Sequence, residues 1–220
     1  MADEGMLYLL GRGILETLYM TVVSTALAYL FGLPLGVLLC VTDENGVFRM
    51  PALNKVLGFI INFLRSVPFL ILLVAILPFT RAIVGTTIGS TATIVPLVIA
   101  AAPFIARMVE SSLKEVDGGV IEASFSMGSS PFQIIYKVLI PEAKPSLLIG
   151  SAIAITTILG YSAMAGFVGG GGLGAIAINY GYYRYQEDVM SVTVLLLVVI
   201  VQIFQEVGMK CARLSDKRIR

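Results

Sequence analysis

The sequence predicts an all-α integral membrane protein with five transmembrane helices, and three observations lead to this prediction. Hydrophobic residues make up 57% of the 220 residues and charged residues only 13%, with a mean hydropathy of +0.93. Soluble domains carry about 25% charged residues, so this chain lacks the polar surface needed to cover a globule in water. The other two observations are a series of long uncharged runs and an uneven distribution of basic residues.

The uncharged runs define the predicted spans, because a transmembrane helix needs about 20 apolar residues. We expect a single transmembrane domain over 1–220, with spans at about 17–41, 56–80, 84–106, 146–166 and 189–207. The second span is interrupted by Arg65 and Pro68. The first is expected to remain uncleaved, since acidic residues rather than a basic region precede it.

The fourth uncharged run, 145–183, is long enough on paper for two crossings. Its second half, Phe167 to Tyr183, contains six glycines among 17 residues, and each glycine costs a helix about 1 kcal/mol relative to alanine. We therefore expect one helix that ends near Gly166, followed by an irregular external or re-entrant segment.

Basic residues predict the orientation of the chain. With five spans and the N-terminus outside, the internal segments are 42–55, 107–146 and the C-terminal tail 208–220. These segments hold eleven of the fifteen lysines and arginines. Basic residues concentrate on the cytoplasmic side of membrane proteins, so we expect an external N-terminus and a cytoplasmic C-terminus.

Several classes of chemistry are excluded by residues that the sequence lacks. Without histidine, and with only two cysteines, the chain offers neither a usual zinc site nor a nucleophile–histidine pair. It has no G-x-x-x-x-G-K-[ST] loop to bind nucleotide phosphates. We therefore expect no catalytic site, metal, cofactor or nucleic-acid partner. Proton-coupled carriers place an ionisable group in mid-membrane. Here the spans offer essentially Arg65 alone and no buried acid, which favours an ATP-driven partner over a gradient.

The long internal segment 107–144 predicts two short helices. Asp117 and the glycines after it indicate a helix start, and apolar residues follow at roughly helical spacing. We expect a tight turn at Gly128 and a second helix from Phe132 to Ile140 that begins near Pro131. The first helix could insert into a groove of a soluble partner, pack against neighbouring internal loops, or lie in lipid headgroups. Its acidic polar face makes the lipid interpretation the weakest.

A spaced motif in this segment resembles the EAA motif of binding-protein-dependent ABC importer permeases. Glu122-Ala123-Ser124 is followed by three residues and Gly128, and nine residues later by Val138-Leu139-Ile140-Pro141. The spacing matches in full, with serine, valine and isoleucine replacing alanine, isoleucine and leucine of the motif. Four other stretches, at 80–85, 101–110, 160–166 and 169–182, look like the methionine permeases of this family.

The resemblance implies a type I importer permease fold in a bacterial inner membrane. It also implies a homodimer, two cytoplasmic ATPase subunits that bind ATP and Mg²⁺, and an external methionine-binding protein, either periplasmic or a lipoprotein. The expected function is a translocation pathway for methionine, coupled to ATP hydrolysis by the separate ATPase. The alternatives are a permease for another amino acid or small solute, or a non-transporting membrane scaffold.

The resemblance also implies which residues couple the permease to the ATPase. Small residues allow close approach, Gly128 permits a sharp turn, and Pro141 is expected to end the second helix and set the entry into the fourth span. Glu122 either pairs with a basic residue of the ATPase or caps its own helix. The expected coupling residues are Glu122, Ala123, Ser124, Phe125, Met127, Gly128 and Pro141.

The translocation pathway is expected to involve Tyr161, Ser162 and Met164, with Met164 as an apolar gate and Tyr161 offering a hydroxyl group. Plain helix packing is the alternative for these residues. On the second span, Asn62 and Arg65 are the polar candidates. Arg65 could face the pathway, reach the membrane surface, or bond carbonyl groups freed near Pro68.

Overall fold

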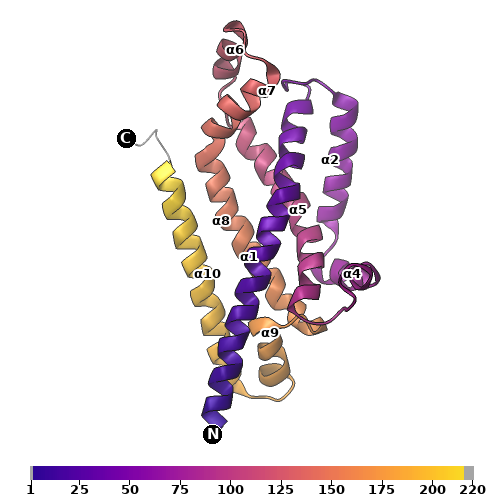
Figure 1. Cartoon of the computed structure of the whole chain (residues 1–220), viewed down its shortest axis with the longest axis vertical. Helices are drawn as coiled ribbons and strands as arrows, with labels where there is room; N and C mark the ends of the chain where they lie inside the picture. The colour runs from indigo at the N-terminus through magenta and orange to yellow at the C-terminus, as the bar shows by residue number, and fades with distance from the viewer. Residues whose placement is uncertain (1, 216–220) are drawn as a thin grey trace. The chain divides into compact units, whose positions relative to one another are not determined.

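The computed structural model describes residues 2–215, and every regular element in that range is helical. The all-α prediction is therefore confirmed for this part of the chain. The residues group into two compact units. Unit 1 comprises Met1–Ala28, Val67–Ala101 and Ala154–Gln205, and unit 2 comprises Tyr29–Ser66, Ala102–Ile153 and Glu206–Arg220. Four long helices contribute a stretch to each unit: α1 (Ala2–Thr42), α5 (Ser90–Lys114), α8 (Ile140–Met164) and α10 (Glu187–Ser215) (Figure 1).

Among the described residues, four helical stretches are long and apolar enough to cross a membrane: Gly5–Thr42, Ser90–Lys114, Pro131–Tyr182 and Glu187–Ser215. A fifth is formed if α2 (Pro51–Ser66) and α3 (Phe69–Ala75) count as one span. These two helices meet at 98°, so the predicted second span at 56–80 is not one straight helix. Pro68 explains the bend, because proline lacks an N–H and disfavours helical backbone at the preceding residue.

Unit 1 is built around the end of α8 and the start of α10. Its core contains the buried residues Leu159, Leu173, Ile176, Val189 and Ile200, against which apolar residues of the first stretch of α1 pack. Two short helices, α3 and α4 (Leu77–Val84), also belong to this unit. Thr17, Thr21, Ser24 and Ala28 repeat at helical spacing along α1 and are almost fully buried.

Unit 2 packs the second stretch of α1 against α2 and α5. Leu39, Ile61 and Ala106 form its buried cluster. Gly32 and Gly36 form a G-x-x-x-G pair on α1, and a Cβ on Gly36 would lie 2.5 Å from the carbonyl oxygen of Ala106. Small residues at this spacing let two helix backbones approach closely, so glycine is required at these positions by the packing of α1 on α5.

The predicted end of the second short helix before Pro141 is wrong. Residues 131–164 form one uninterrupted helical run, from α7 (Pro131–Ile134) through the π-helix η1 (Ile135–Leu139) into α8. Pro141 therefore does not end the second helix. The wider π turn, in which the Ile140 amide bonds the Ile135 carbonyl, occurs directly before the proline. It accommodates a residue that lacks an N–H and crowds the preceding turn.

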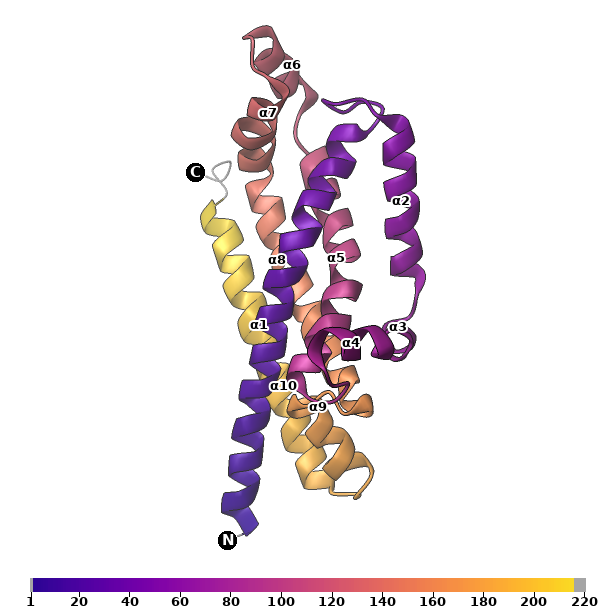
Figure 2. The ribbon, with the colours of Figure 1, turned by 45° about the vertical axis from the view of Figure 1, so that its right-hand side comes forward.

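The glycine-rich segment, residues 165–182, is more ordered than predicted. Helix α8 ends at Met164, close to the expected end at Gly166. A 3-10 turn η2 (Ala165–Val168) then leads to α9 (Gly172–Ile176) and the π-helix η3 (Ala177–Tyr182). Both views show this part folding back as a compact helical turn (Figures 1 and 2). The segment is therefore helical over most of its length.

Candidate functional site

Helices α6 (Gly118–Ser126) and α7 form a hairpin over residues 117–134 in unit 2, and Figure 2 shows it projecting from the ends of α5 and α8. The hairpin begins at Asp117, whose Oδ1 accepts a hydrogen bond from the Gly119 amide at 2.7 Å. This bond satisfies one of the free amide groups at the helix start. The predicted helix start at Asp117 is thus confirmed.

The turn of the hairpin is centred on Gly128. Its φ is +82°, a left-handed conformation that glycine adopts without a Cβ clash. The Gly128 amide donates to the Phe125 carbonyl, and the Ser129 amide donates to the Ser124 carbonyl. This pair of bonds is a Schellman motif, so the predicted tight turn at Gly128 is confirmed in detail.

The second arm of the hairpin begins with a capping box. The Ser130 hydroxyl accepts from the Gln133 amide, and the Gln133 side chain accepts from the Ser130 amide at 2.8 Å. Pro131 occupies the first helical turn, where its missing N–H is not needed. The chain then continues into α8 without a break.

The exposed face of the hairpin carries most of the predicted coupling residues. Glu122, Ala123, Phe125, Met127 and Gly128 are exposed, with Met127 78% exposed. Ser124 differs, since it is buried and its hydroxyl donates to the Val120 carbonyl. Its small size therefore serves packing within the chain. Glu122 lies in the second turn of α6 and does not cap the helix, because Asp117 holds that position.

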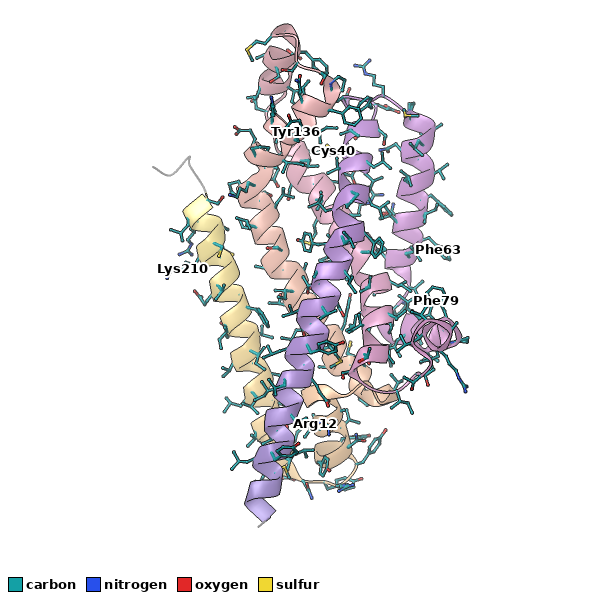
Figure 3. The ribbon with its side chains drawn as sticks, in the orientation of Figure 1. Arg12, Cys40, Phe63, Phe79, Tyr136 and Lys210 are labelled. Carbon is teal, nitrogen blue, oxygen red and sulfur yellow. The ribbon has the colours of Figure 1, made fainter. Side chains whose placement is uncertain are left out.

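Two aromatic residues extend this exposed face onto the second arm. Phe132 is 72% exposed and Tyr136 58% exposed; Tyr136 is labelled in Figure 3. The Phe132 ring contacts the Phe48 ring edge-on at 5.5 Å between centroids. Phe125, Met127, Phe132 and Tyr136 are thus exposed apolar side chains on or next to the hairpin, and exposed apolar patches mark interaction surfaces.

An ion network fixes the ends of α1 and α5 next to the hairpin. Lys114 Nζ lies 2.5 Å from Asp43 Oδ2 and 2.9 Å from Glu110 Oε1. The other oxygen of Glu110 lies 2.6 Å from Arg107 Nη1, and Arg107 also donates to the Gly58 carbonyl of α2. The Lys114 hydrogen bond, with the Glu44 amide, lowers the pKa of Asp43. Ion pairs thus join the end of α1 to α5, and a hydrogen bond joins α5 to the middle of α2.

A half-open cavity of about 360 Å³ lies between this network and α6. Its lining includes Cys40, Val47, Lys114, Ile121 and Leu139. Only the Ile121 and Ser124 side of α6 is covered by the rest of unit 2. One side of α6 therefore borders a cavity, and the hairpin is connected through the chain to α5 and α8. A force applied to its exposed face would pass into those two helices.

The predicted pathway residues fall in both units. In unit 1, Tyr161 stacks on Phe69 with the rings 4.5 Å apart and nearly parallel, and Ser162 is buried with its hydroxyl on the Leu159 carbonyl. Met164, the last residue of α8, is 48% exposed. In unit 2, Asn62 and Arg65 are exposed on α2. Met164 and Tyr161 thus lie one turn apart at the end of α8.

Comparison with known proteins assigns the family. Residues 28–220 match the family described as binding-protein-dependent transport system inner membrane component. The chain belongs to this family. A probable D-methionine transport system permease protein from Vibrio cholerae is 52% identical over 203 residues, covering 92% of this chain and 90% of the relative. The corresponding protein from Escherichia coli is 52% identical over 164 residues, or 74% and 76% of the two chains.

Solved structures agree in fold. An inward-facing structure of the MetNI methionine ABC transporter contains a chain that is 50% identical, with a TM-score of 0.96, covering 97% of this chain and 99% of that one. An amino acid ABC transporter crystallised with histidines shares only the fold, at 20% identity and a TM-score of 0.75. The chain therefore has the type I importer permease fold and is an inner membrane component of an ABC importer.

Two acidic residues lie within long helices of this permease where the sequence did not predict them. Glu110 is buried within α5, so the expectation of no buried acid is wrong; the predicted span ended at 106 and left Glu110 in the internal segment. Glu16 lies within the first candidate span and accepts a hydrogen bond from Gly172. The predicted span begins at about 17 and so leaves Glu16 just outside, although a charge inside an apolar run is itself a signal of function.

Proposed function

We propose that this chain is the methionine-translocating permease of an ATP-binding-cassette importer. The observation that carries the proposal is the match to the MetNI permease chain, at 50% identity across 97% of this chain, together with relatives named as D-methionine permeases. At this identity, over the full length of the fold, the substrate class is expected to be shared.

The proposed assembly is a homodimer in the inner membrane, with two cytoplasmic ATPase subunits and an external methionine-binding protein. Residues 1–220 would act as one transmembrane domain with five spans, an external N-terminus and a cytoplasmic C-terminus. Five helices cannot readily enclose a path for an amino acid, whereas ten around a two-fold axis can. The chain has no catalytic role of its own in this scheme, and ATP and Mg²⁺ bind to the ATPase.

In the proposed mechanism the hairpin 117–134 transmits movement of the ATPase to the pathway. Phe125, Met127 and Phe132 would insert into a cleft of the ATPase, helix-in-groove fashion. The hairpin lies between α5 and α8 with only a few residues at each joint. ATP binding would draw the two hairpins together and open the seam between subunits outward, and hydrolysis would let it open inward. Met164 would close the seam as an apolar gate.

The test is uptake of radiolabelled methionine into proteoliposomes that contain this chain, its ATPase and its binding protein, with and without internal ATP. We expect ATP-dependent accumulation. Replacing Phe125 and Met127 with aspartate should abolish it and should release the ATPase from the complex. The matched control is Tyr182→Ala, since Tyr182 is an exposed aromatic residue outside the hairpin; it should leave ATPase binding unchanged.

The outcome also separates the alternatives. Accumulation of another amino acid in place of methionine would contradict the substrate and retain the importer. A complex that hydrolyses ATP without moving any solute would contradict the transport function.

A further inference from the structure

The end of α8 is held in place by side chains that come from distant parts of the sequence. After Met164 the chain reverses through residues 165–172 and enters α9. Gly169, Gly171 and Gly172 in this stretch all have positive φ. A run of such residues has little intrinsic preference for one conformation. The Gly169 and Gly170 amides bond the Gly166 and Ala165 carbonyls within the segment, and other bonds come from outside it.

Two side chains of α1 supply part of that order. The Gly172 amide donates to Glu16 Oε2 at 2.9 Å, and the Leu173 amide donates to Thr17 Oγ1 at 2.9 Å. These are the first amide groups of α9, which have no partner within the helix. Glu16 and Thr17 therefore cap α9 from another helix, 156 positions away in the sequence.

Helix α5 and the residue before it supply further bonds. Thr93 donates from Oγ1 to the Gly170 carbonyl at 3.1 Å, and the Gly89 amide donates to the Gly169 carbonyl at 2.9 Å. The Gly169 and Gly170 carbonyls are thereby bonded to this part of the chain, and the Gly172 and Leu173 amides to α1. All of these residues belong to unit 1.

The packing leaves no space for a different arrangement. A Cβ on Gly172 would lie 2.6 Å from Thr17 Oγ1, and one on Gly171 would lie 3.0 Å from Glu16 Oε2. On the other side, Gly174 lies directly against the Ala163 backbone, next to Met164. Displacement of α9 from α1 would thus be felt at once at the last turn of α8.

Glu16 is an unusual residue for this position. It lies within the first candidate membrane span, with its side chain about a quarter exposed, and burying a carboxylate is costly unless it is paired and hydrogen-bonded. One oxygen meets Arg12 Nε at 2.9 Å and the other meets the Gly172 amide. Arg12, labelled in Figure 3, is itself two-thirds exposed, so the inward oxygen is directed specifically at the glycine turn.

We propose that Glu16, assisted by Thr17, is a positioning residue for the gate at the end of α8. By capping α9 it fixes residues 165–174 and, through them, the position of Met164. This inference rests on the proposed function, because the gate at Met164 is part of that function. The fixed segment gives Met164 a rigid support, so that the gate opens only when the helices that hold the segment move.

The test measures the segment directly and needs no substrate. Hydrogen exchange of the 169–174 amides is followed in the full chain, assembled with its ATPase in lipid nanodiscs. We expect Glu16→Ala and Thr17→Val to speed this exchange at least about tenfold. Each variant removes one hydrogen bond to α9, and a cost of about 1.4 kcal/mol for that bond corresponds to a factor of ten in the exchange rate. Glu16→Gln keeps an acceptor for the Gly172 amide and should stay within about threefold of wild type.

Thr25→Val is the matched control. Thr25 lies on the same helix, and its hydroxyl bonds only the Thr21 carbonyl of that helix, so exchange at 169–174 should not change. A second readout is the rate at which a thiol reagent modifies Met164→Cys in a chain carrying Cys40→Ser and Cys211→Ser. That rate should rise with Glu16→Ala and return toward the parent value with Glu16→Gln.

Three results would overturn the proposal. These are unchanged exchange in Glu16→Ala, exchange in Glu16→Gln as fast as in Glu16→Ala, or faster exchange with no change at Met164→Cys. The last would separate the segment from the gate. Absence of methionine uptake by the wild-type complex would contradict the proposed function alone, because neither exchange nor thiol modification depends on the solute.

Discussion

The hairpin 117–134 and the glycine-rich segment 165–182 both reverse the chain with left-handed glycines, yet only the glycine-rich segment is also bonded by side chains from distant parts of the sequence. In the hairpin the hydrogen bonds are local: Asp117 bonds two residues ahead, Ser130 and Gln133 bond each other, and Gly128 completes a Schellman motif. The glycine-rich segment also has local bonds, from the Gly169 amide to the Gly166 carbonyl and from the Gly170 amide to the Ala165 carbonyl. Side chains of α1 and α5 add bonds to this segment across 156 and 77 sequence positions.

The surfaces of the two regions differ accordingly. Phe125 and Met127 of the hairpin face outward, whereas Gly172, Leu173 and Gly174 are buried. A segment whose hydrogen bonds are all local keeps its shape while it moves as a rigid body or docks against a partner. One that is stabilised by distant side chains reports the positions of the helices that hold it. The first suits a transmitter and the second suits a gate support.

The largest expected effect comes from alanine at Gly172, compared with alanine at a glycine where a Cβ meets open space. Gly172→Ala should lower the free energy of unfolding by about 2–4 kcal/mol, because a left-handed φ costs an L-residue about 1–2 kcal/mol and the new Cβ overlaps Thr17. Thermal unfolding of the purified chain in detergent measures this. Gly160→Ala is the control: a Cβ there meets nothing within 4 Å, and alanine favours a helix, so stability should hold or rise.

A smaller effect is expected at the ion network of unit 2. Glu110→Gln leaves Arg107 and Lys114 without their shared carboxylate, and breaking a largely buried pair in this way should cost about 2 kcal/mol. Glu115→Gln, at an exposed acid just beyond α5, should change unfolding by less than about 0.5 kcal/mol. Equal effects of the two variants would mean that Glu110 does not hold the base of the hairpin.

The difference between the two regions also explains what the sequence could predict. The start of α6 at Asp117, the turn at Gly128 and the role of Pro131 were all correct, since each depends on residues a few positions apart. The helix across Pro141 was not predicted, because a π turn depends on how the whole run packs. The order of the glycine-rich segment was missed for a related reason, since glycine composition alone indicates flexibility and the acceptors lie on other helices.

The charged residues show the same limit. Glu16 and Glu110 were placed outside the spans because charge usually ends an apolar run. The structure extends α1 to Ala2 and α5 to Lys114, so both acids lie on membrane-length helices with specific partners. The G-x-x-x-G pair at Gly32 and Gly36 was a readable signal for close helix packing that the sequence analysis did not use.

Gly128→Ala sharpens the comparison with Gly172→Ala. The backbone strain is the same in kind, with φ +82° at Gly128 and +72° at Gly172, but a Cβ on Gly128 meets no atom within 4 Å. We expect a cost of about 1 kcal/mol, seen as a smaller decrease in thermal stability than that of Gly172→Ala, and about a fivefold loss of ATP-dependent uptake. Gly118→Ala, also with open space but without positive φ, should leave uptake unchanged.

The smallest expected effect is a pH dependence at the base of the hairpin. The Lys114 hydrogen bond holds the pKa of Asp43 below its ordinary value of 3.8. A carboxylate with a lowered folded pKa contributes stability that is complete above the unfolded value and is lost as pH falls through the folded one. Both side chains are partly exposed, so the contribution should be below about 1 kcal/mol.

Thermal unfolding of wild type and Asp43→Asn between pH 6 and 3 measures this contribution. The wild type should be slightly more stable at pH 6, and the difference should begin to shrink as the pH falls below about 3.8. Glu44→Gln, at the exposed neighbouring acid, should run parallel to wild type. A difference that stayed constant from pH 6 to pH 3 would mean that Asp43 acts through packing. The ion pair between Asp43 and Lys114 would then contribute no electrostatic stabilisation to the fold.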